Sequence, residues 1–205
     1  MYIPAYFQEH DLYAAAALVR EFSFGTVVSV VDGLPWATHI PVQLEIDKEG
    51  KWLLHCHIAR ANPQWRHFES QPYVLAMFMG AHSYISPSWY DSPNVPTWNY
   101  QAVHLTGEAT IMTQTVLLAM LRSMMAHYET AHASTPLAFD NIPIEVLEKD
   151  LKGVVGITIQ VQKIEAVRKL SQNRNEVSQQ NIIQELKKLD TYDAIRIAAE
   201  MNKKH

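Results

Sequence analysis

Cysteine is nearly absent from this sequence: Cys56 is the only one among 205 residues, so no disulfide can form within the chain. Cys56 stands in the apolar run KWLLHCHI, which favours a small buried side chain over a nucleophile. No apolar run approaches the roughly eighteen residues of a membrane span. The opening MYIPAYFQEHDL also lacks the basic and apolar segments of a secretory leader. We therefore expect a cytoplasmic protein that does not enter a membrane.

The usual phosphate and metal motifs are missing as well. The sequence contains no GxGxxG, no GxxxxGK[ST] and no CxxC. His55 and His57 alternate along one predicted strand, but no carboxylate or cysteine nearby on that face completes a ligand set, so we expect no metal. No Ser-His-Asp or Cys-His constellation can be assembled either, and no catalytic residue is assigned.

Positive charge is scarce in the first half of the chain. The net charge is −4 and the isoelectric point is near 6.2, which opposes a broad nucleic-acid surface. Residues 1 to 100 hold nine acids and only five cations, which are Arg20, Lys48, Lys51, Arg60 and Arg66. Two of these five fall inside or just after residues 57–65, and this concentration marks that run for attention.

The hydrophobic pattern predicts a mainly β fold with flanking helices (α+β). Helices are expected at about 9–22, from Pro63 onward, at about 113–130, and twice within about 176–202. Six strands are expected, at 24–31, 39–46, 51–58, 73–80, 99–112 and 153–167. Because most of their connections are short and turn-like, we predict roughly six antiparallel strands that close into a barrel, in one continuous fold over 1–205.

The run HIARANPQW (57–65) has the pattern of a turn that holds an anion. A buried strand ends there, Arg60 follows it, and Asn62 and Pro63 begin a helix. A guanidinium beside free backbone amides is matched to phosphate oxygens. The alternative is structural: Arg60 caps a neighbouring carbonyl and Asn62 starts the helix.

Three further runs combine polar and aromatic side chains: YISPSWY (84–90), VPTWNY (95–100) and KLSQNR (169–174). Trp89 and Trp98 could stack on a flat ligand, or they could pack within their own loop or against a partner subunit. Lys169 and Arg174 flank three hydrogen-bonding side chains, although this run could instead cap the next helix through Asn173 or Asn175.

These runs, together with MYIPAYF, FGT at 24–26 and THIP at 38–41, resemble the PaiB family of FMN-binding negative transcriptional regulators over nearly the whole chain. The resemblance implies a single FMN-binding split β-barrel domain over 1–205, a homodimer, and FMN near the subunit interface. Residues 138–153 match less closely and receive no role.

Carried over by position, the resemblance places Arg60 and Asn62 near the FMN phosphate. Gln64 and Trp65 would support that turn, while Thr38 and His39 would face the same crevice. The flavin ring or the partner subunit would be bordered by Ser86, Trp89, Trp98 and Asn99. The site would be closed by Lys169, Ser171, Gln172 and Arg174.

Two functions follow from the resemblance. In the first, the dimer senses FMN or its redox state and represses genes. Direct DNA binding is left open and is not favoured, because the final helix pair carries acids beside its cations. In the second, the protein is an oxidoreductase in which FMN exchanges electrons with NAD(P)H or oxygen. A dimeric scaffold that has lost its FMN site is a third reading.

Overall fold

The computed structural model describes residues 1–203, and their contacts divide them into two compact units. We call residues 23–76 and 105–163 the barrel unit. The helical unit comprises residues 1–22 and 77–104 together with the described chain from residue 164 onward. The sequence predicts a single domain, and each unit is described by itself below. No helix among residues 1–203 is long and apolar enough to cross a membrane.

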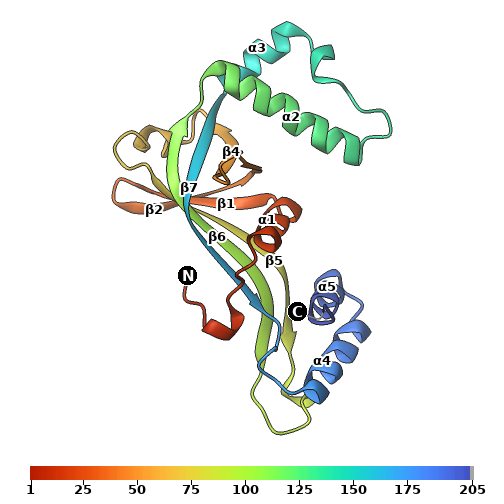
Figure 1. The fold of residues 1–205 in the computed structure, drawn as a ribbon. Coiled ribbons are helices and arrows are strands. Elements are labelled where there is room, and N and C mark those ends of the chain that lie inside the picture. The colour runs from red at the N-terminus through yellow and green to blue at the C-terminus, as the bar shows by residue number, and fades with distance from the viewer. Residues whose placement is uncertain (204–205) are drawn as a thin grey trace. The chain divides into compact units, whose positions relative to one another are not determined.

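The sheet is mainly antiparallel and has seven strands rather than six, in the order β2-β1-β5-β6-β7-β4-β3 (Figure 1). The strands are β1 Phe24–Val31, β2 Leu34–Pro41, β3 Gln43–Ile46, β4 Trp52–Ala59, β5 Tyr73–Ile85, β6 Thr97–Ile111 and β7 Val154–Lys169. The last three contribute residues to both units. β5 continues five residues beyond the predicted end at Gly80.

The predicted strand at 39–46 is wrong, because the structure contains two strands there. β2 pairs with β1 and β3 pairs with β4, with Val42 between them. Pro41 has no backbone N–H to donate, which favours a break in the ladder at this point. β2 and β3 stand at the two ends of the strand order although they are consecutive in the chain, and β2 contacts β4. The sheet of the barrel unit therefore curls round on itself.

The hairpin between β1 and β2 follows from its turn residues. Asp32 and Gly33 have φ angles of 51° and 78°, as a two-residue primed turn requires. This turn places Val31 opposite Leu34 and fixes the register along both strands. The predicted Asp32-Gly33 turn is confirmed.

Side-chain caps set the helix starts. α1 (Leu12–Glu21) begins after Asp11, later than the predicted Glu9, because the Asp11 carboxylate accepts the Tyr13 N–H. Thr113 caps α2 (Gln114–His132), Asn175 caps α4 (Glu176–Lys188) and Thr191 caps α5 (Tyr192–Met201). The sequence reading missed α3 (Ile144–Lys152), which has no side-chain cap and no buried residue. The remaining helices are short 3₁₀ turns: η1 Ala5–Phe7, η2 Pro63–His67, η3 Pro87–Trp89 and η4 Phe139–Asn141.

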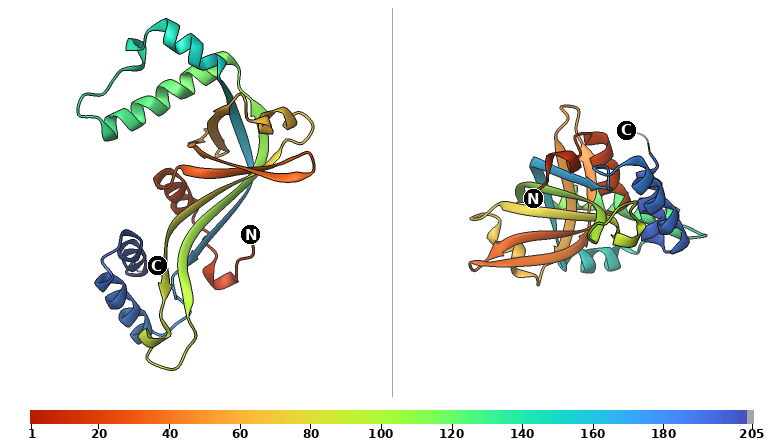
Figure 2. Two further views of the ribbon diagram at one scale, coloured as in Figure 1. Left: turned by 180° about the vertical axis from the view of Figure 1, so that it is seen from behind. Right: turned by 90° about the horizontal axis from the view of Figure 1, so that it is seen from below.

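Each unit has its own apolar cluster. In the helical unit α4 and α5 pack side by side (Figures 1 and 2) and bury Ile182, Leu186 and Ile197 together with Ile85 of β5. In the barrel unit the cluster under α2 contains Leu117, Met120 and Met124, with Leu121 and Tyr128 partly buried. Met120 is therefore a core residue of this cluster.

Candidate functional site

The barrel unit holds a hydrogen-bonded cluster around Gln64, a glutamine only 1% exposed. Thr38 Oγ1 donates to Gln64 Oε1 at 2.7 Å, and Asn62 Nδ2 donates to Thr38 Oγ1 at 2.9 Å. Gln64 Nε2 reaches the Val27 carbonyl at 3.2 Å. The Asn62 side chain also accepts the Gln64 N–H at 3.1 Å and so begins η2. Three predicted site residues thus form one rigid platform behind the Arg60 turn.

Arg60 uses part of its guanidinium as a structural cap. Its Nε donates to the Lys152 carbonyl at 2.8 Å and its Nη2 to the Val154 carbonyl at 2.9 Å. Trp65 Nε1 donates to the Arg60 carbonyl at 2.9 Å, and its ring centre lies 5.9 Å from the guanidinium carbon. The alternative given by the sequence, in which Arg60 caps neighbouring carbonyls, is therefore present in the structure. Nη1 makes no hydrogen bond within the described chain, so an exposed edge of the charge stays open to an anion.

His39 is not brought to this cluster. Neighbouring residues of a strand point to opposite faces, and while Thr38 bonds Gln64, His39 Nδ1 pairs with Thr26 Oγ1 at 2.8 Å. His39 is exposed, whereas Thr38 is half-buried. The expectation that both would face one crevice does not match their orientation in β2.

The helical unit contains a pair of cations without a counter-ion. Lys169 Nζ donates to Thr97 Oγ1 at 2.6 Å, and the Arg174 guanidinium lies 5.4 Å from the centre of the Tyr90 ring. Neither cation forms an ion pair with a carboxylate in the described part of the chain. Burial, and after it the charge of Arg174, lowers the pKa of Lys169 below its ordinary value. A bound anion would relieve this repulsion.

The turn between these two cations is strained and tightly held. Ser171 has a φ of 59°, which is unfavourable for a serine. Its Oγ donates to Oδ1 of Asn99, which is fully buried, at 3.0 Å. Gln172 Oε1 accepts the Leu170 N–H at 2.7 Å. The structure therefore brings Asn99, Ser171 and Gln172 together around one preorganised turn.

The two loop tryptophans differ in availability. Trp98 is 52% exposed, with its ring centre 6.1 Å from that of His82 and 6.0 Å from that of Tyr84. Trp89 instead packs against the apolar cluster under α4 and α5. Ser86 caps η3 by accepting the Ser88 N–H at 3.3 Å. Trp98 offers a free aromatic face, whereas Trp89 and Ser86 serve local packing.

Several contributing residues were missed by sequence reasoning. Thr97 and Tyr90 contact the two cations, while His82 and Tyr84 flank Trp98. Thr97 and Tyr90 lie inside the runs 95–100 and 84–90, so their place in these runs could have identified them as site residues. The sequence around His82 does not identify it as a site residue, because its contact with Trp98 depends on the pairing of β5 with β6.

This chemistry fits a flavin mononucleotide. Its dianionic phosphate calls for cations that lack carboxylate partners, and its flat ring calls for an exposed aromatic or apolar surface. Within the helical unit, Lys169 and Arg174 supply the first and Trp98 supplies the second. Within the barrel unit, Arg60 by itself offers an open guanidinium edge. Residues 1–203 contain no group of three or more His, Cys, Asp or Glu side chains placed to hold a metal.

Comparisons with known proteins identify the class. A family model described as "Putative FMN-binding domain" matches residues 1–163. The fold is similar to the FAD and heme binding protein of Mycobacterium smegmatis, with a TM-score of 0.59 and 14% identity over 79% of this chain and 73% of that one. The flavocytochrome Anf3 of Azotobacter vinelandii also gives 0.59, with 13% identity over 82% and 72%. The chain is thus a flavin-binding split-barrel protein.

A relative over the full length then gives the family. "Protease synthase and sporulation protein PAI 2" of Bacillus subtilis is 44% identical over 204 residues, covering 100% of this chain and 98% of the relative. The chain belongs to the PaiB family of FMN-binding proteins, and its cofactor is FMN.

Proposed function

We propose that this protein is a cytoplasmic, FMN-dependent negative regulator of gene expression that responds to FMN or to its redox state. The observation that carries the proposal is the FMN-binding family match over residues 1–163, joined to a full-length relative at 44% identity. When bound, FMN supplies a redox-active ring. The side chains of this protein hold the phosphate, orient the ring and limit its contact with water.

The predicted contact residues remain the proposed FMN ligands. One charge-assisted hydrogen bond contributes about 1.5 to 3 kcal/mol, whereas micromolar affinity needs about 8 kcal/mol. Several contacts are therefore needed. The proposed contacts in the barrel unit are Thr38, Arg60 and Asn62, with Gln64 and Trp65 supporting the Arg60 turn. Those in the helical unit are Trp98, Asn99, Lys169, Ser171, Gln172 and Arg174. The remaining predicted residues, His39, Ser86 and Trp89, are proposed only to border the site, because their side chains already make the local contacts described above.

The role of Arg60 can be tested by comparing FMN with riboflavin, which lacks the phosphate. We expect Arg60→Ala to weaken FMN binding about tenfold or more, because one charge-assisted contact is lost, and to change riboflavin binding little. Titration monitored by flavin fluorescence measures both affinities. The matched control is Arg66→Ala, since Arg66 also lies over the Trp65 ring, at 5.6 Å, and is exposed.

Two results would contradict this assignment. Unchanged FMN affinity in Arg60→Ala would remove Arg60 from the phosphate site. A parent protein that binds neither flavin, even after reconstitution, would overturn the proposed function itself.

The cations of the last two helices support indirect rather than direct regulation of DNA. Two of the three cations on α4 and α5 are paired, Arg196 with Glu21 and Lys188 with Glu185, and Lys187 has no ion pair within the described chain. Paired cations add little to phosphate binding, which depends on free positive charge. We propose that repression runs through another protein. A gel shift with candidate operator DNA that weakens steeply with salt would show direct contact instead.

The alternative function is an FMN-dependent oxidoreductase that uses NAD(P)H or oxygen. The exposed ring of Trp98 favours this alternative. A flavin stacked on Trp98 would keep its other face accessible to a second substrate. A steady-state assay of NADH and NADPH consumption separates the two. Rapid turnover with an acceptor supports the enzyme, and its absence across acceptors supports the sensor.

We propose that the protein is a homodimer whose subunits meet through the outer face of the β1–β2 hairpin. Phe24 is 70% exposed and Val30 is 41% exposed on β1. The register sets Phe24 opposite Pro41 and Val30 opposite Pro35. Paired strand residues share a face, so these apolar side chains lie on one exposed surface, with the Thr26–His39 pair between them. A second copy of the chain carries the same surface, as a two-fold interface requires.

A further inference from the structure

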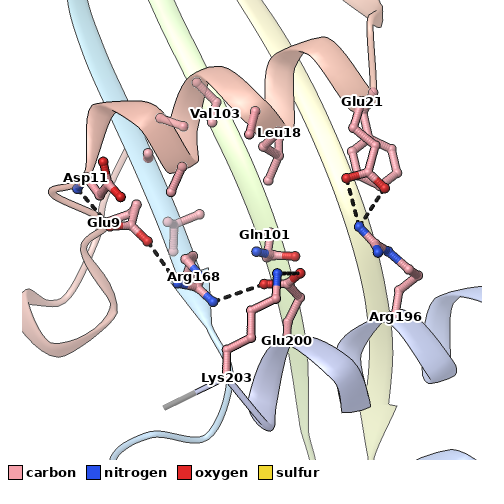
Figure 3. Close-up of a pocket in the computed structure, with 16 residues that line it drawn as sticks. Glu9, Asp11, Leu18, Glu21, Gln101, Val103, Arg168, Arg196, Glu200 and Lys203 are labelled. Atoms are coloured by element: carbon pink, nitrogen blue, oxygen red, sulfur yellow. Dashed lines mark hydrogen bonds and ion pairs between the residues drawn. The ribbon is translucent and has the colours of Figure 1, made fainter. Parts of the chain in front are cut away.

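Asp91 differs from the ion-paired carboxylates of the helical unit. In Figure 3, Glu200 accepts from Arg168 at 3.0 Å. Glu21 is paired with Arg196 in the same view. Asp91 forms no ion pair within residues 1–203, and its carboxylate accepts instead from two neutral side chains at the start of α4. The charge of Asp91 therefore holds two chain segments together and neutralises no cation.

The contacts of Asp91 form a closed ring with residues 84 and 87 positions further along the chain. Asn175 Nδ2 donates to Asp91 Oδ2 at 2.8 Å, and Ser178 Oγ donates to Asp91 Oδ1 at 2.6 Å. The Asp91 N–H donates to Ser178 Oγ at 3.3 Å. Asn175 Oδ1 accepts the Ser178 N–H at 2.9 Å, and this contact also caps α4. We call Asp91, Asn175 and Ser178 the Asp91 clamp.

The clamp joins the residues that directly follow Tyr90 and Arg174. Asp91 comes after Tyr90 and Asn175 comes after Arg174, whose guanidinium carbon lies 5.4 Å from the centre of the Tyr90 ring. The Tyr90 hydroxyl is buried and has no hydrogen-bond partner in the described chain, so it does not fix the ring. Apolar packing and the clamp therefore keep this ring beside the guanidinium.

The main chain of Arg174 is held on both sides. Its N–H donates to the Ser171 carbonyl at 3.0 Å, and its carbonyl accepts from Gln179 Nε2 at 2.7 Å. A side chain that must become ordered when a ligand binds loses part of its binding free energy to that ordering. Arg174 is spared much of this loss, because its main chain and the ring beside its guanidinium are fixed beforehand.

The carboxylate of Asp91 suits this arrangement by its charge. Hydrogen bonds from Ser178 and then from Asn175 lower the pKa of Asp91 below its ordinary value, so it stays ionised at neutral pH. An ionised carboxylate only accepts hydrogen bonds, and this one faces two donors. Because Asp91 forms no ion pair with Arg174, the guanidinium stays available to an anion.

We infer that Asp91 is a positioning residue for phosphate recognition by Arg174. Through Asn175 it holds the start of α4 against the segment that carries Tyr90, and so orders the guanidinium before the phosphate binds. The inference rests on the proposed FMN site. It adds to that site a residue that acts through Arg174 and does not touch the ligand.

The test uses Asn175→Asp in the full-length protein. Aspartate caps a helix as well as asparagine does, so α4 keeps its cap, but two carboxylates then face each other and the clamp opens. We expect FMN binding to weaken about tenfold, as for the loss of one charge-assisted contact. Binding of riboflavin, which lacks the phosphate, should change about twofold or less, because Arg174 makes no phosphate contact to it. Titration monitored by flavin fluorescence measures both.

A second substitution should restore the clamp. In the double variant Asp91→Asn, Asn175→Asp the amide and the carboxylate exchange places, so the donor and acceptor again face each other. Its FMN affinity should return to within about threefold of the parent. The matched control is Asn173→Asp, which adds the same charge beside Arg174 at an exposed position outside the clamp and should change FMN affinity about twofold or less.

The possible results separate cleanly. Unchanged FMN affinity in Asn175→Asp, or a double variant that binds no tighter, would overturn the inference. An equal loss in Asn173→Asp would do the same, because added charge would then explain it. If Asn175→Asp does not fold, Ser178→Ala removes one donor to Asp91 and should weaken FMN about threefold, and an unchanged affinity there would overturn the inference. A parent that binds neither flavin would instead overturn the proposed function, and this inference with it.

Discussion

Three buried amides illustrate how the side chains of this protein divide between internal contacts and contact with solvent. Gln64 is bonded on all sides, and Asn99 is bonded to Ser171. Gln101 is 8% exposed and forms no side-chain hydrogen bond to the rest of the described chain, and its amide atoms are accessible to solvent. The first two amides therefore position other residues, whereas the amide of Gln101 keeps its contact with solvent.

The altered pKa of Lys169 predicts effects on both FMN binding and folding stability. Folding lowers the pKa of Lys169 below the value of 10.5 that it has in the unfolded chain. Below the lowered pKa the side chain is charged in both states, and this charge reduces the folding stability. The loss of stability fades as the pH rises toward 10.5, where the side chain becomes neutral. We expect Lys169→Met to weaken FMN binding and to raise the melting temperature of the apoprotein at pH 7. The gain in melting temperature should shrink toward pH 10.5.

The measurement is calorimetric melting of the apoprotein at several pH values, together with FMN titration. Lys163→Met serves as the control, because Lys163 is exposed and lies outside the proposed contacts. An affinity for FMN equal to that of the parent would exclude Lys169 from the phosphate site.

At the scale of elements, the local sequence pattern predicted some strand and helix bounds and failed to predict others. Alternating apolar residues predicted β1 from Phe24 to Val31, and the structure confirms both ends. Alternation could not show that the strand predicted at 39–46 is interrupted at Val42, because the pattern itself continues through the break. α3 escaped prediction because it begins without a side-chain cap and buries none of its residues.

Gly107 marks a close approach of two strands in the barrel unit. A Cβ at this position would lie 2.2 Å from the Gln160 carbonyl oxygen of β7. Backbone cannot move aside as a flexible side chain can, so Gly107→Ala should lower the free energy of unfolding by about 3 kcal/mol. Urea denaturation measures the loss.

Thr110→Ala on the same strand is the control. It removes one exposed hydrogen bond, from Thr110 Oγ1 to the Thr158 carbonyl, and should cost about 1 kcal/mol or less. A Gly107→Ala variant as stable as Thr110→Ala would show that the two strands separate freely there.

At the scale of the whole molecule, the proposed homodimer depends on the apolar face of the β1–β2 hairpin. Lysine at these positions should separate the subunits, because the interface would then have to bury an unpaired ammonium group. The free-energy cost of that burial exceeds what the remaining apolar contacts supply. We expect the double variant Phe24→Lys, Val30→Lys to be monomeric at micromolar concentration, and the parent to be dimeric. Sedimentation velocity measures both states.

Ile144→Lys provides the matched control, since Ile144 is also exposed, at 58%, and lies on α3 of the same unit rather than on the hairpin. It should remain dimeric. A monomeric parent, or a dimeric double variant, would contradict the interface.

The sequence by itself determined β1, the Asp32-Gly33 turn and the family, because these depend on residues close together in the chain or on motifs read directly. It singled out Arg60, Lys169 and Arg174 for the same reason. The tertiary structure alone decided what those side chains touch. Arg60 reaches carbonyls 92 and 94 residues away, and Lys169 reaches the hydroxyl of Thr97, 72 residues away. Contacts over such separations depend on how apolar surfaces pack, and a local pattern carries no record of that packing.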